Sequence, residues 1–345
     1  MGVKLSDIVP KQQMTIEEIG AAARGKPLAV DAFNTIYQFL SIIRQPDGTP
    51  LMDSKGHITS HLSGLFYRNL NLIEAGIKLI YVFDGPKPKF KREVVAERAE
   101  IRAKAKEKWA AALATGDLAE ARKFAQAATE LTDKMIEESK RLLQAMAIPV
   151  VQAPSEGEAQ AAQIAADENA WAVVSQDFDS LLFGATRLVR NLSITGRRKI
   201  PGREEWKEIS PELIELAAAL KNLGIKREQL VLIGILSGTD YNSGGIARIG
   251  PKTALKLVKE HKTLAEVLKN VEWRFEISAS DIYDFFLNPP VAKKYSLKAG
   301  KVDKAAIKKI LMQEHEFSEE RVENAFKRIE EIEQKKKQTT LGGWR

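Results

Sequence analysis

The chain has 345 residues, carries a formal net charge of +7 and contains no cysteine. The lack of cysteine excludes disulfides, thiolate metal sites and cysteine nucleophiles, and it fits an intracellular protein. The four histidines are scattered without the HExxH spacing, and no apolar run approaches the roughly 20 residues of a membrane span. The excess of Lys and Arg favours a polyanionic partner, although charge alone does not distinguish this from an ordinary basic protein.

Short apolar runs alternate with helical patterns, which predicts an α/β fold with a mostly parallel, twisted sheet flanked by helices. The strands are predicted at Leu28–Val30, Lys78–Phe83, Ile148–Val151, Ala170–Val174 and Arg187–Asn191. The main helices are predicted at Thr35–Ile43, Thr59–Glu74, Ala159–Ala166, Leu213–Leu220, Gln229–Leu236, Thr253–Glu260 and Phe317–Ile332. The stretch Phe275–Leu311 is predicted to form helices joined by a turn at Pro289-Pro290.

Acidic residues lie just beyond the ends of four of these strands. They are Asp31, Asp84, Glu156, Glu158, Asp177 and Asp179. In parallel sheets the carboxyl ends of strands form the ligand-binding edge, so we expect these carboxylates to lie close together. Clustered carboxylates repel each other unless a cation lies among them, and oxygen-only donors suit Mg²⁺ or Mn²⁺. With Asp240 added, the set can hold two ions, which suits phosphodiester hydrolysis.

Two of these acids also fit a purely structural role. Ser155 and Glu158 have the spacing of a helix capping box, in which each side chain bonds the backbone of the other residue. Glu156 and Glu158 can converge on one ion only if the helix begins at this point of the chain. The capping box and the metal site are compatible if Ser155 starts the helix.

The segment 86–130 differs in composition from the residues before it, because it is rich in charged residues and alanine. Residues 86–108 contain nine basic side chains against four acidic ones. High helix propensity predicts two helices, broken at Thr115-Gly116-Asp117, with Asp117 as the N-cap of the second. Few large apolar residues are present, so the pair is expected either to stand off the body or to form a solvated surface.

A glycine-rich turn precedes the helix Thr253–Glu260. Gly245 and Gly250 can present backbone N–H groups at the helix N-terminus, and Lys252 adds a positive charge. This pattern resembles a helix-hairpin-helix that grips duplex phosphates, although an ordinary Gly-Pro helix start remains the simpler alternative. The C-terminal segment Lys335–Arg345 is polar and is predicted to be disordered alone.

The order of these motifs resembles the XPG-like family of structure-specific 5′ nucleases, in its archaeal and eukaryotic flap endonuclease type. The resemblance spans nearly the whole chain. It is carried by AVDAFNTIYQFL (29–40), SHLSGLFYR (60–68), YVFDGPKPKFK (81–91), APSEGEAQAA (153–162), SQDFDSLLFG (175–184), LSGTDYN (236–242) and GGIARIGPKTAL (244–255).

The resemblance implies a PIN-like 5′-nuclease fold and a flap endonuclease with 5′-3′ exonuclease activity in DNA replication and repair. It implies two Mg²⁺ ions, replaceable by Mn²⁺, held directly or through water by Asp31, Asp84, Glu156, Glu158, Asp177, Asp179 and Asp240. It assigns Lys91 and Arg98 to catalysis at the scissile phosphate. The implied DNA-binding residues are Gly2, Tyr37, Arg44, Arg68, Glu156, Gly238, Gly245, Gly250 and Lys252.

The resemblance also divides the chain into segments. They are an N-terminal nuclease region (1–102), a helical arch (86–130), an internal nuclease region (120–261) with an H2TH-type helix-hairpin-helix (237–261), a C-terminal helical region (262–333) and a flexible tail (335–345). The tail resembles a box that binds a sliding clamp of the PCNA type, through Gln338, Leu341 and Trp344. Arg345 replaces the second aromatic residue of that box.

Two alternatives remain open from the sequence. A relative of this family could act mainly as a 5′ exonuclease or as a bubble or junction endonuclease. A non-enzymatic DNA-binding module is the other, but such a module would not need the seven acids. The resemblance further implies flap or nicked DNA as partner, a monomer, no membrane association, and a cytoplasmic location for the archaeal type or a nuclear one for the eukaryotic type.

Overall fold

The computed structural model describes residues 2–45, 47–194, 196–199 and 206–342. The chain forms two compact units that are interleaved in the sequence. The first unit comprises residues 1–34, 80–99 and 151–295, and the second comprises residues 35–79, 100–150 and 296–345. The segment boundaries expected from the family resemblance follow the sequence linearly and stay predictions.

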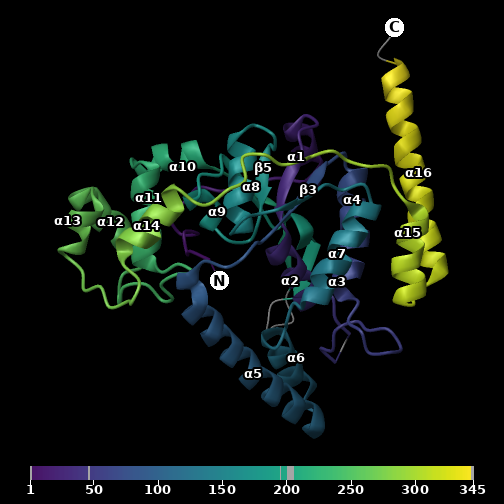
Figure 1. Cartoon of the computed structure of the whole chain (residues 1–345), viewed down its shortest axis with the longest axis horizontal. Helices are drawn as coiled ribbons and strands as arrows, with labels where there is room; N and C mark the ends of the chain where they lie inside the picture. The colour runs from purple at the N-terminus through teal and green to yellow at the C-terminus, as the bar shows by residue number, and fades with distance from the viewer. Residues whose placement is uncertain (1, 46, 195, 200–205, 343–345) are drawn as a thin grey trace. The chain divides into compact units, whose positions relative to one another are not determined.

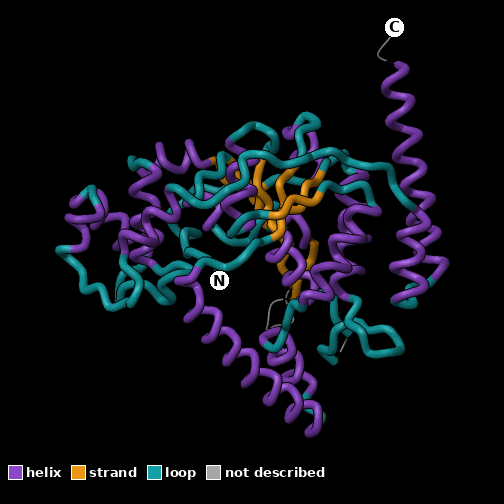
Figure 2. The backbone as a smooth tube through the Cα atoms, viewed as in Figure 1, coloured by secondary structure: helices purple, strands orange, loops and turns teal. Residues whose placement is uncertain are grey.

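The centre of the first unit is a seven-stranded sheet in the order β1-β9-β6-β5-β2-β3-β4 (Figure 2). Its strands are β1 Gln12–Gln13, β2 Leu28–Asp31, β3 Leu79–Phe83, β4 Val150–Gln152, β5 Ala172–Val174, β6 Arg187–Arg190 and β9 Glu212–Glu215. β5 pairs in parallel with both β2 and β6, whereas β9 runs antiparallel to β6 and β1. The predicted α/β class and mostly parallel sheet are therefore confirmed.

The central strands are buried at every position. All residues of β2, β3 and β5 are buried, from Leu28 to Asp31, from Leu79 to Phe83 and from Ala172 to Val174. Continuous apolar strands of this kind are typical of parallel sheets covered by helices on both faces. α8 (Gly157–Ala166), for example, lies against β2 and β5 (Figure 1). Asp31 is the acidic exception in these strands, and it lies at the carboxyl end of β2.

Further helices complete the first unit. They are α1 Ile16–Ala23, α9 Asp179–Leu182, α10 Leu216–Leu223, α11 Arg227–Ser237, α12 Pro251–His261, α13 Leu264–Leu268 and α14 Ala279–Leu287. α11 packs against both α12 and α14 (Figure 1). A separate two-stranded sheet pairs β7 Gly196–Lys199 antiparallel with β8 Trp206–Ile209.

Two predicted helices of this unit are wrong in part. Leu213–Leu220 begins as strand β9, because Leu213 and Ile214 are buried and pair with β6; the helix begins only at Leu216. In the stretch Phe275–Leu311, the helical part begins at Ala279, and no regular element lies between Leu287 and Lys304, a range that the structure describes throughout. Pro289-Pro290 removes two backbone donors, which explains why the helix cannot continue.

The second unit is mainly helical. Its elements are α2 Ala32–Ile42, α3 Ser60–Ser63, a π-helical turn Gly64–Arg68, α4 Asn69–Glu74, α5 Arg92–Thr115, α6 Leu118–Ala127, α7 Asp133–Ala145, α15 Lys304–Lys308, a π-helical turn Lys309–Glu314 and α16 Glu319–Gly342; α2 and α5 begin in the first unit. A short 3-10 turn, Lys89–Lys91, precedes α5. Asp117 caps α6, because its carboxylate accepts hydrogen bonds from the N–H groups of Ala119 and Glu120, as predicted.

The predicted disorder of the C-terminal segment is wrong for most of its length. The backbone of α16 continues through residues 335–342, since the run of Glu, Gln and Lys favours helix and contains no breaker before Gly342. Nearer its N-terminus, α16 forms ion pairs with α4, between Arg328 and Glu74, and with α15, between Glu323 and Lys308.

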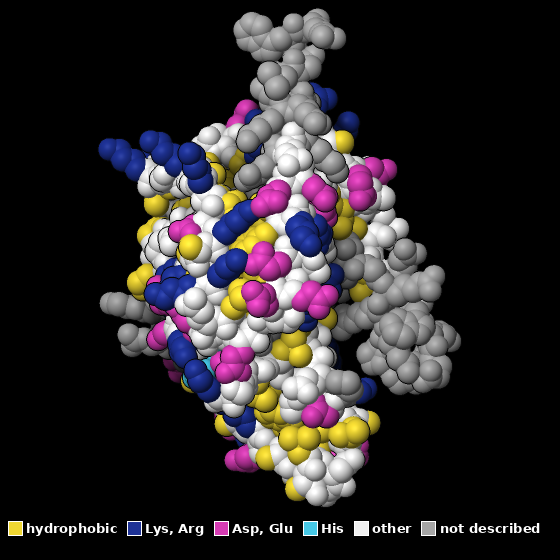
Figure 3. Space-filling model, turned by 90° about the vertical axis from the view of Figure 1, so that its right-hand side faces the viewer, with side chains coloured by type: hydrophobic (Ala, Val, Ile, Leu, Met, Phe, Trp, Pro, Cys, Tyr) yellow, Lys and Arg dark blue, Asp and Glu magenta, His cyan; other side chains and the backbone are white. Residues whose placement is uncertain are grey.

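Acidic and basic side chains lie interspersed over much of the face shown in Figure 3. None of the described helices combines the length and the apolar character that crossing a membrane requires.

Candidate active site

All seven predicted acids belong to the first unit. Asp31 is the last residue of β2, Asp84 follows β3, and Asp177 lies between β5 and α9. Glu156 is the N-cap of α8, Glu158 lies in its first turn, Asp179 begins α9, and Asp240 follows α11. Hydrogen bonds and ion pairs from residues that are distant in the sequence bring these acids together.

The Ser175 hydroxyl connects Asp31 with Glu158, and a second serine holds Glu158. The Ser175 hydroxyl lies 3.2 Å from Asp31 Oδ2 and 2.9 Å from Glu158 Oε1. The Ser180 hydroxyl donates to the same Glu158 oxygen at 2.8 Å. Glu158 therefore points toward the carboxyl ends of β2 and β5, and the first turn of α8 is held at this edge.

A second group of contacts fixes Asp177 and Asp179. The Asn34 side-chain amide donates to Asp177 Oδ2 at 3.1 Å, and its backbone N–H donates to Asp31 Oδ1 at 3.1 Å. The N–H of Gly2 donates to Asp177 at 3.0 Å, and the N–H of Val3 donates to Asp179 at 2.7 Å. The N-terminal segment is thus bonded to the acids by its backbone.

Gly2 approaches these acids more closely than any other residue type could. A Cβ at Gly2 would lie 2.5 Å from Asp177 Cβ and 2.9 Å from Asp179 Oδ1. Real side chains do not come so close, so a larger residue would displace either the segment or the two carboxylates. The predicted DNA-binding position Gly2 therefore lies directly against the acidic cluster.

Asp84 takes the capping role that the sequence suggested for Ser155. Its Oδ1 accepts the N–H of Gly157 at 2.8 Å, and the N-cap residue of α8 is Glu156, which makes no side-chain cap bond. The predicted capping box is wrong, because Glu158 bonds serine hydroxyls instead of turning back to the backbone. The helix does begin between Glu156 and Glu158, as their convergence requires.

Lys91 and Arg98 bring two cations into the cluster. Lys91 Nζ lies 2.8 and 3.0 Å from the two Glu156 carboxylate oxygens and 3.5 Å from Asp240 Oδ2. The guanidinium of Arg98 donates to Asp240 Oδ1 at 2.5 Å. Lys91 is only 8% exposed, so its charge is compensated by these acids rather than by water.

Several acids of the cluster have raised pKa values, because of burial and because negative charges are crowded together there. Burial and the charge of Glu156 raise the pKa of Asp84 to about 6, and burial with Asp240 and Asp177 raises the pKa of Asp179 to about 7. Burial and neighbouring acids raise the pKa of both Asp31 and Glu158 well above the usual range. Burial would also raise the pKa of Asp240, but Lys91 and Arg98 lower it.

These residues fit divalent metal ions well. Four carboxyl groups resist ionisation because they are buried beside one another, and a cation among them would remove that cost. Every acidic donor offers oxygen, which suits hard ions such as Mg²⁺, Ca²⁺ or Mn²⁺. Of the residues predicted from the sequence, the structure therefore brings the seven acids together with Lys91 and Arg98.

The glycine turn before α12 is tightly packed. Gly238 and Gly245 have φ of 100° and 62°, and a Cβ at Gly245 would lie 2.4 Å from the Gly238 nitrogen. Gly250 is the N-cap of α12 without a side-chain cap, and Lys252 in the first turn is exposed. The N-terminus of α12 consequently presents uncapped backbone N–H groups beside an exposed positive charge.

Three predicted DNA-binding residues lie in the second unit. Tyr37 is a half-exposed residue of α2, and Arg68 ends the π-helical turn. Arg44 is held by the protein itself: its guanidinium donates to the Gly48 carbonyl at 2.8 Å and to the Thr129 hydroxyl at 2.6 Å. Of the tail residues, Gln338 and Leu341 belong to the α16 backbone, and Trp344 lies outside the described residues.

Several supporting residues were not predicted from the sequence. Asn34, Ser175 and Ser180 carry no charge and have common spacings, so nothing in the sequence separated them from ordinary polar residues. An aromatic cluster behind Lys91 was also missed: Tyr241 lies 5.2 Å from both Phe90 and Phe285 between ring centroids. Lys91 Nζ lies 5.6 Å from the centroid of the Tyr241 ring, so the aromatic cluster covers one side of the lysine.

Comparison with known proteins agrees with this geometry. Residues 1–105 match the family model of the XPG N-terminal domain, and residues 147–240 match that of the XPG I-region. The chain is 53% identical over 344 residues to Flap endonuclease 1 of Pyrococcus abyssi, a match that covers 100% of this chain and 98% of the relative. The chain belongs to the flap endonuclease family.

Other relatives support the same assignment for this flap endonuclease. Flap endonuclease 1 of Pyrococcus furiosus is 53% identical, covering 100% of this chain and 99% of the relative. The solved flap endonuclease-1 of Methanococcus jannaschii is 41% identical with a TM-score of 0.76, covering 97% of this chain and 100% of that one. The catalytic core of Rad2, 22% identical with a TM-score of 0.70 over 96% of this chain and 100% of that one, shares the fold.

Proposed function

We propose that this chain is a structure-specific flap endonuclease with 5′-3′ exonuclease activity. It cleaves 5′ flaps at the junction of single- and double-stranded DNA during replication, in Okazaki fragment maturation, and during repair. The observation that carries the proposal is the convergence of seven carboxylates with Lys91 and Arg98, in a chain 53% identical over its length to proteins named Flap endonuclease 1. The products are a 5′-phosphate and a 3′-hydroxyl.

The seven acids are proposed to hold two Mg²⁺ ions, for which Mn²⁺ can substitute. Asp31, Glu158, Asp179 and Asp84 are the carboxyls whose raised pKa supports this assignment. When bound, such ions activate a water and stabilise the leaving oxygen of the phosphodiester. The chain's own contribution is to hold the carboxylates in place through Asn34, Ser175, Ser180 and the N–H groups of residues 2 and 3.

Lys91 and Arg98 are proposed to position and polarise the scissile phosphate. Each cation is fixed beside Asp240, so neither must reorganise when negative charge develops on the phosphate oxygens. The wall of Phe90, Tyr241 and Phe285 restricts Lys91 on the other side. A preorganised, partly dehydrated cation stabilises a transition state far more than a solvated one.

The remaining DNA contacts are proposed from the predicted positions. The N-terminus of α12, with Gly250 and Lys252, grips duplex phosphates, and Gly238 and Gly245 form the turn before it. Tyr37, Arg44, Arg68, Gly2 and Glu156 are proposed to contact the DNA, and segment 86–130 is proposed to form the arch for the 5′ strand. These are the DNA-binding assignments that mutagenesis can address one residue at a time.

The protein is proposed to act as a monomer, and its location is proposed to be the cytoplasm because the Pyrococcus relatives are archaeal.

We propose that a sliding clamp binds the tail through Gln338, Leu341 and Trp344. The measurement is titration of the full chain and of Trp344→Ala with the clamp by surface plasmon resonance. Equal affinity of the two chains for the clamp would contradict the proposed anchor.

The function is tested with a labelled double-flap DNA in Mg²⁺ and again in EDTA. We expect cleavage at the flap junction in Mg²⁺ and none in EDTA. A panel of flap, nicked, bubble and four-way junction DNA separates the candidate activities under the same conditions. Preferred cleavage of bubbles or junctions, or degradation from a nick without flap incision, would contradict the flap assignment; binding without cleavage would indicate a DNA-binding module.

A further inference from the structure

Three of the chain's four histidines gather at one place in the second unit, although they are far apart in the sequence. His57 lies in the loop after α2, His61 in α3, and His315 directly after the π-helical turn that precedes α16. Two acids, Asp53 and Glu138, lie among them. The proposed flap endonuclease reaction uses none of these five residues.

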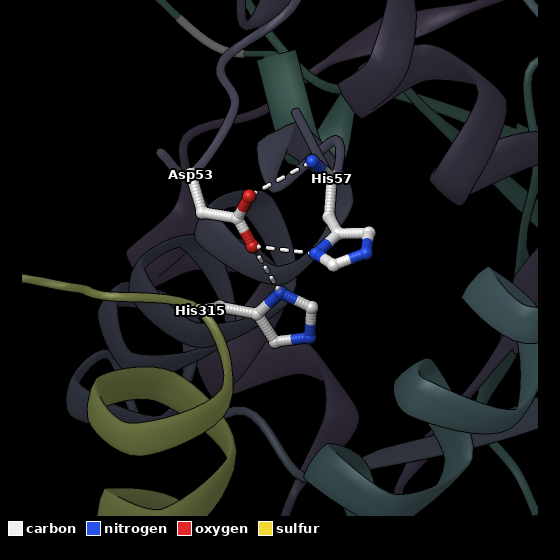
Figure 4. Close-up of side chains that lie close together, drawn as sticks. All are labelled: Asp53, His57 and His315. Atoms are coloured by element: carbon white, nitrogen blue, oxygen red, sulfur yellow. Dashed lines mark hydrogen bonds and ion pairs between the residues drawn. The ribbon is translucent and has the colours of Figure 1, made fainter. Parts of the chain in front are cut away.

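Three donor atoms of this group face a common point. Asp53 Oδ2 lies 2.9 Å from His57 Nδ1 and 3.5 Å from His315 Nδ1, and the three atoms all lie within 4.8 Å of one another (Figure 4). The other oxygen of Asp53 accepts the N–H groups of Lys55 and His57 at 2.9 and 2.8 Å. The turn therefore fixes Asp53 with one oxygen and leaves the other directed at the two imidazoles.

A second layer of contacts orients His315. Its Nε2 lies 3.2 Å from Glu138 Oε1, and the other Glu138 oxygen lies 3.3 Å from His61 Nε2. The side chains of His61 and His315 are almost fully buried, at 0% and 2% exposure. An imidazole that directs one nitrogen at a shared point and gives the other to a buried carboxylate is the arrangement found around protein metal sites.

The donor set selects a class of ion. Two imidazole nitrogens and one carboxylate oxygen suit borderline ions such as Zn²⁺, and they do not suit Mg²⁺, which prefers oxygen donors. Zn²⁺ binds such donors at about 2.0–2.2 Å in a tetrahedron, so donor atoms lie roughly 3.3 Å apart. The 2.9 and 3.5 Å separations lie on either side of that value. The His57 side chain is 44% exposed, which leaves an approach for water or an entering ion.

We propose that Asp53, His57 and His315 form a second metal site, which binds Zn²⁺ or a similar borderline divalent ion and shares no residue with the acidic cluster. Glu138 positions His315, and His61 positions Glu138. Occupation of the site would link the loop 47–58 to His315, the residue that follows the turn Lys309–Glu314. The competing explanation is a hydrogen-bonded network of histidines and carboxylates that needs no ion.

Histidine-detected NMR of the full chain distinguishes these explanations, because the acidic cluster contains no histidine. The long-range ¹H–¹⁵N spectrum is recorded during titration with Zn²⁺ and, separately, with Mg²⁺. We expect Zn²⁺ to shift the Nδ1 resonances of His57 and His315, while His261 stays unchanged and Mg²⁺ shifts none of them. Unperturbed His57 and His315 resonances in saturating Zn²⁺ would overturn the proposal.

Variants supply the second measurement, by competition for Zn²⁺ with a chromophoric chelator. His57→Ala removes a half-exposed ligand and should eliminate the Zn²⁺ equivalent assigned to this site. Glu138→Gln should weaken the affinity of the site for Zn²⁺ roughly 10- to 100-fold. The matched control His261→Ala should bind Zn²⁺ like the unmodified chain. Identical Zn²⁺ binding by His57→Ala and His261→Ala would show that the cluster is only a hydrogen-bonded network.

Discussion

Gly2 illustrates how the N-terminal segment constrains the active-site residues. Replacing it with alanine places a methyl group where Asp177 Cβ would lie only 2.5 Å away. We expect Gly2→Ala to displace the carboxylates and to reduce single-turnover cleavage by roughly 100-fold, the cost typical of an ångström-scale misplacement. The measurement is rapid-quench cleavage of flap DNA, with circular dichroism to follow the fold.

A matched control exists at Gly300, where an added Cβ would meet no atom within 4 Å. Gly300→Ala should cleave flap DNA at the unmodified rate. If Gly2→Ala did the same, the close approach of residue 2 to the acids would have no consequence for activity.

Asp179 is the acid whose loss should separate chemistry from binding. It is 4% exposed, accepts the Val3 N–H at 2.7 Å and has its pKa raised to about 7 by burial and by Asp240. We expect Asp179→Ala to abolish cleavage while the protein still binds flap DNA, measured by fluorescence anisotropy in Ca²⁺. The exposed Asp7→Ala serves as control. Full activity of Asp179→Ala in saturating Mg²⁺ would refute its role.

Lys91 should act mainly in the chemical step. Its ammonium is fixed by Glu156 and lies beside Asp240, so it can stabilise developing charge without rearranging. We expect Lys91→Ala to lower the single-turnover rate about 10²- to 10³-fold, the typical effect of removing one preorganised electrostatic group. Its DNA affinity should fall much less, and the exposed Lys78→Ala should change neither quantity. A loss of rate that merely follows the loss of affinity would argue against this role.

At the level of elements, the convergence of the acids was predictable and their detailed support was not. Asp31 and Asp179 could be placed together because the carboxyl ends of parallel strands β2 and β5 share one edge of the sheet. The capping of α8 was not predictable, because Asp84 reaches Gly157 from another strand. A local pattern such as the capping box reports only neighbours in sequence, whereas this contact joins residues 73 positions apart.

The same limit explains the errors in secondary structure. Leu213 and Ile214 have a helical context, but pairing with β6 makes them a strand. The C-terminal segment was expected to lack structure because it is polar, yet a helix already begun at Glu319 can propagate through such residues. Both outcomes depend on what precedes or adjoins the segment rather than on its own composition.

The helix-hairpin-helix offers an element-scale prediction. Lys252 is exposed at the N-terminus of α12, close to the N-cap residue Gly250, which has no side chain to bond the free N–H groups. We expect Lys252→Ala to weaken binding of duplex-containing substrates irrespective of their sequence and to reduce the slope of log K against log salt by about 0.9, one phosphate contact. Binding is measured by anisotropy between low and moderate salt. An unchanged salt slope would show that Lys252 does not contact phosphate.

At the scale of the whole molecule, the crowded acids should make stability depend on pH and on Mg²⁺. Asp179 and Asp84 have folded-state pKa values of about 7 and about 6, above the unfolded value near 3.9. The metal-free folded state therefore binds more protons between about pH 4 and pH 7, and its free energy of unfolding should fall as pH rises through that window. Mg²⁺ at about 100 times its Kd should restore about 2.7 kcal/mol at neutral pH.

Urea unfolding in EDTA and in Mg²⁺ across this pH range tests the effect. Asp179→Asn is the informative variant, because it removes one ionisable group from the cluster while preserving its size. We expect its metal-free stability to fall less steeply with pH than that of the unmodified chain. If the two curves ran parallel, the ionisation of Asp179 would not oppose folding.

The interleaving of the two units has a consequence for how the chain is made. The chain passes from one unit to the other after residues 34, 79, 99, 150 and 295, and the edge strand β1 pairs with β9 through Gln12 and Leu213. Neither unit can therefore be completed on the ribosome while the chain is still short. The early segments must wait for partners synthesised much later. A chain truncated after residue 34, 79, 99 or 150 would leave both units incomplete, whereas truncation after residue 295 would remove only the last segment of the second unit.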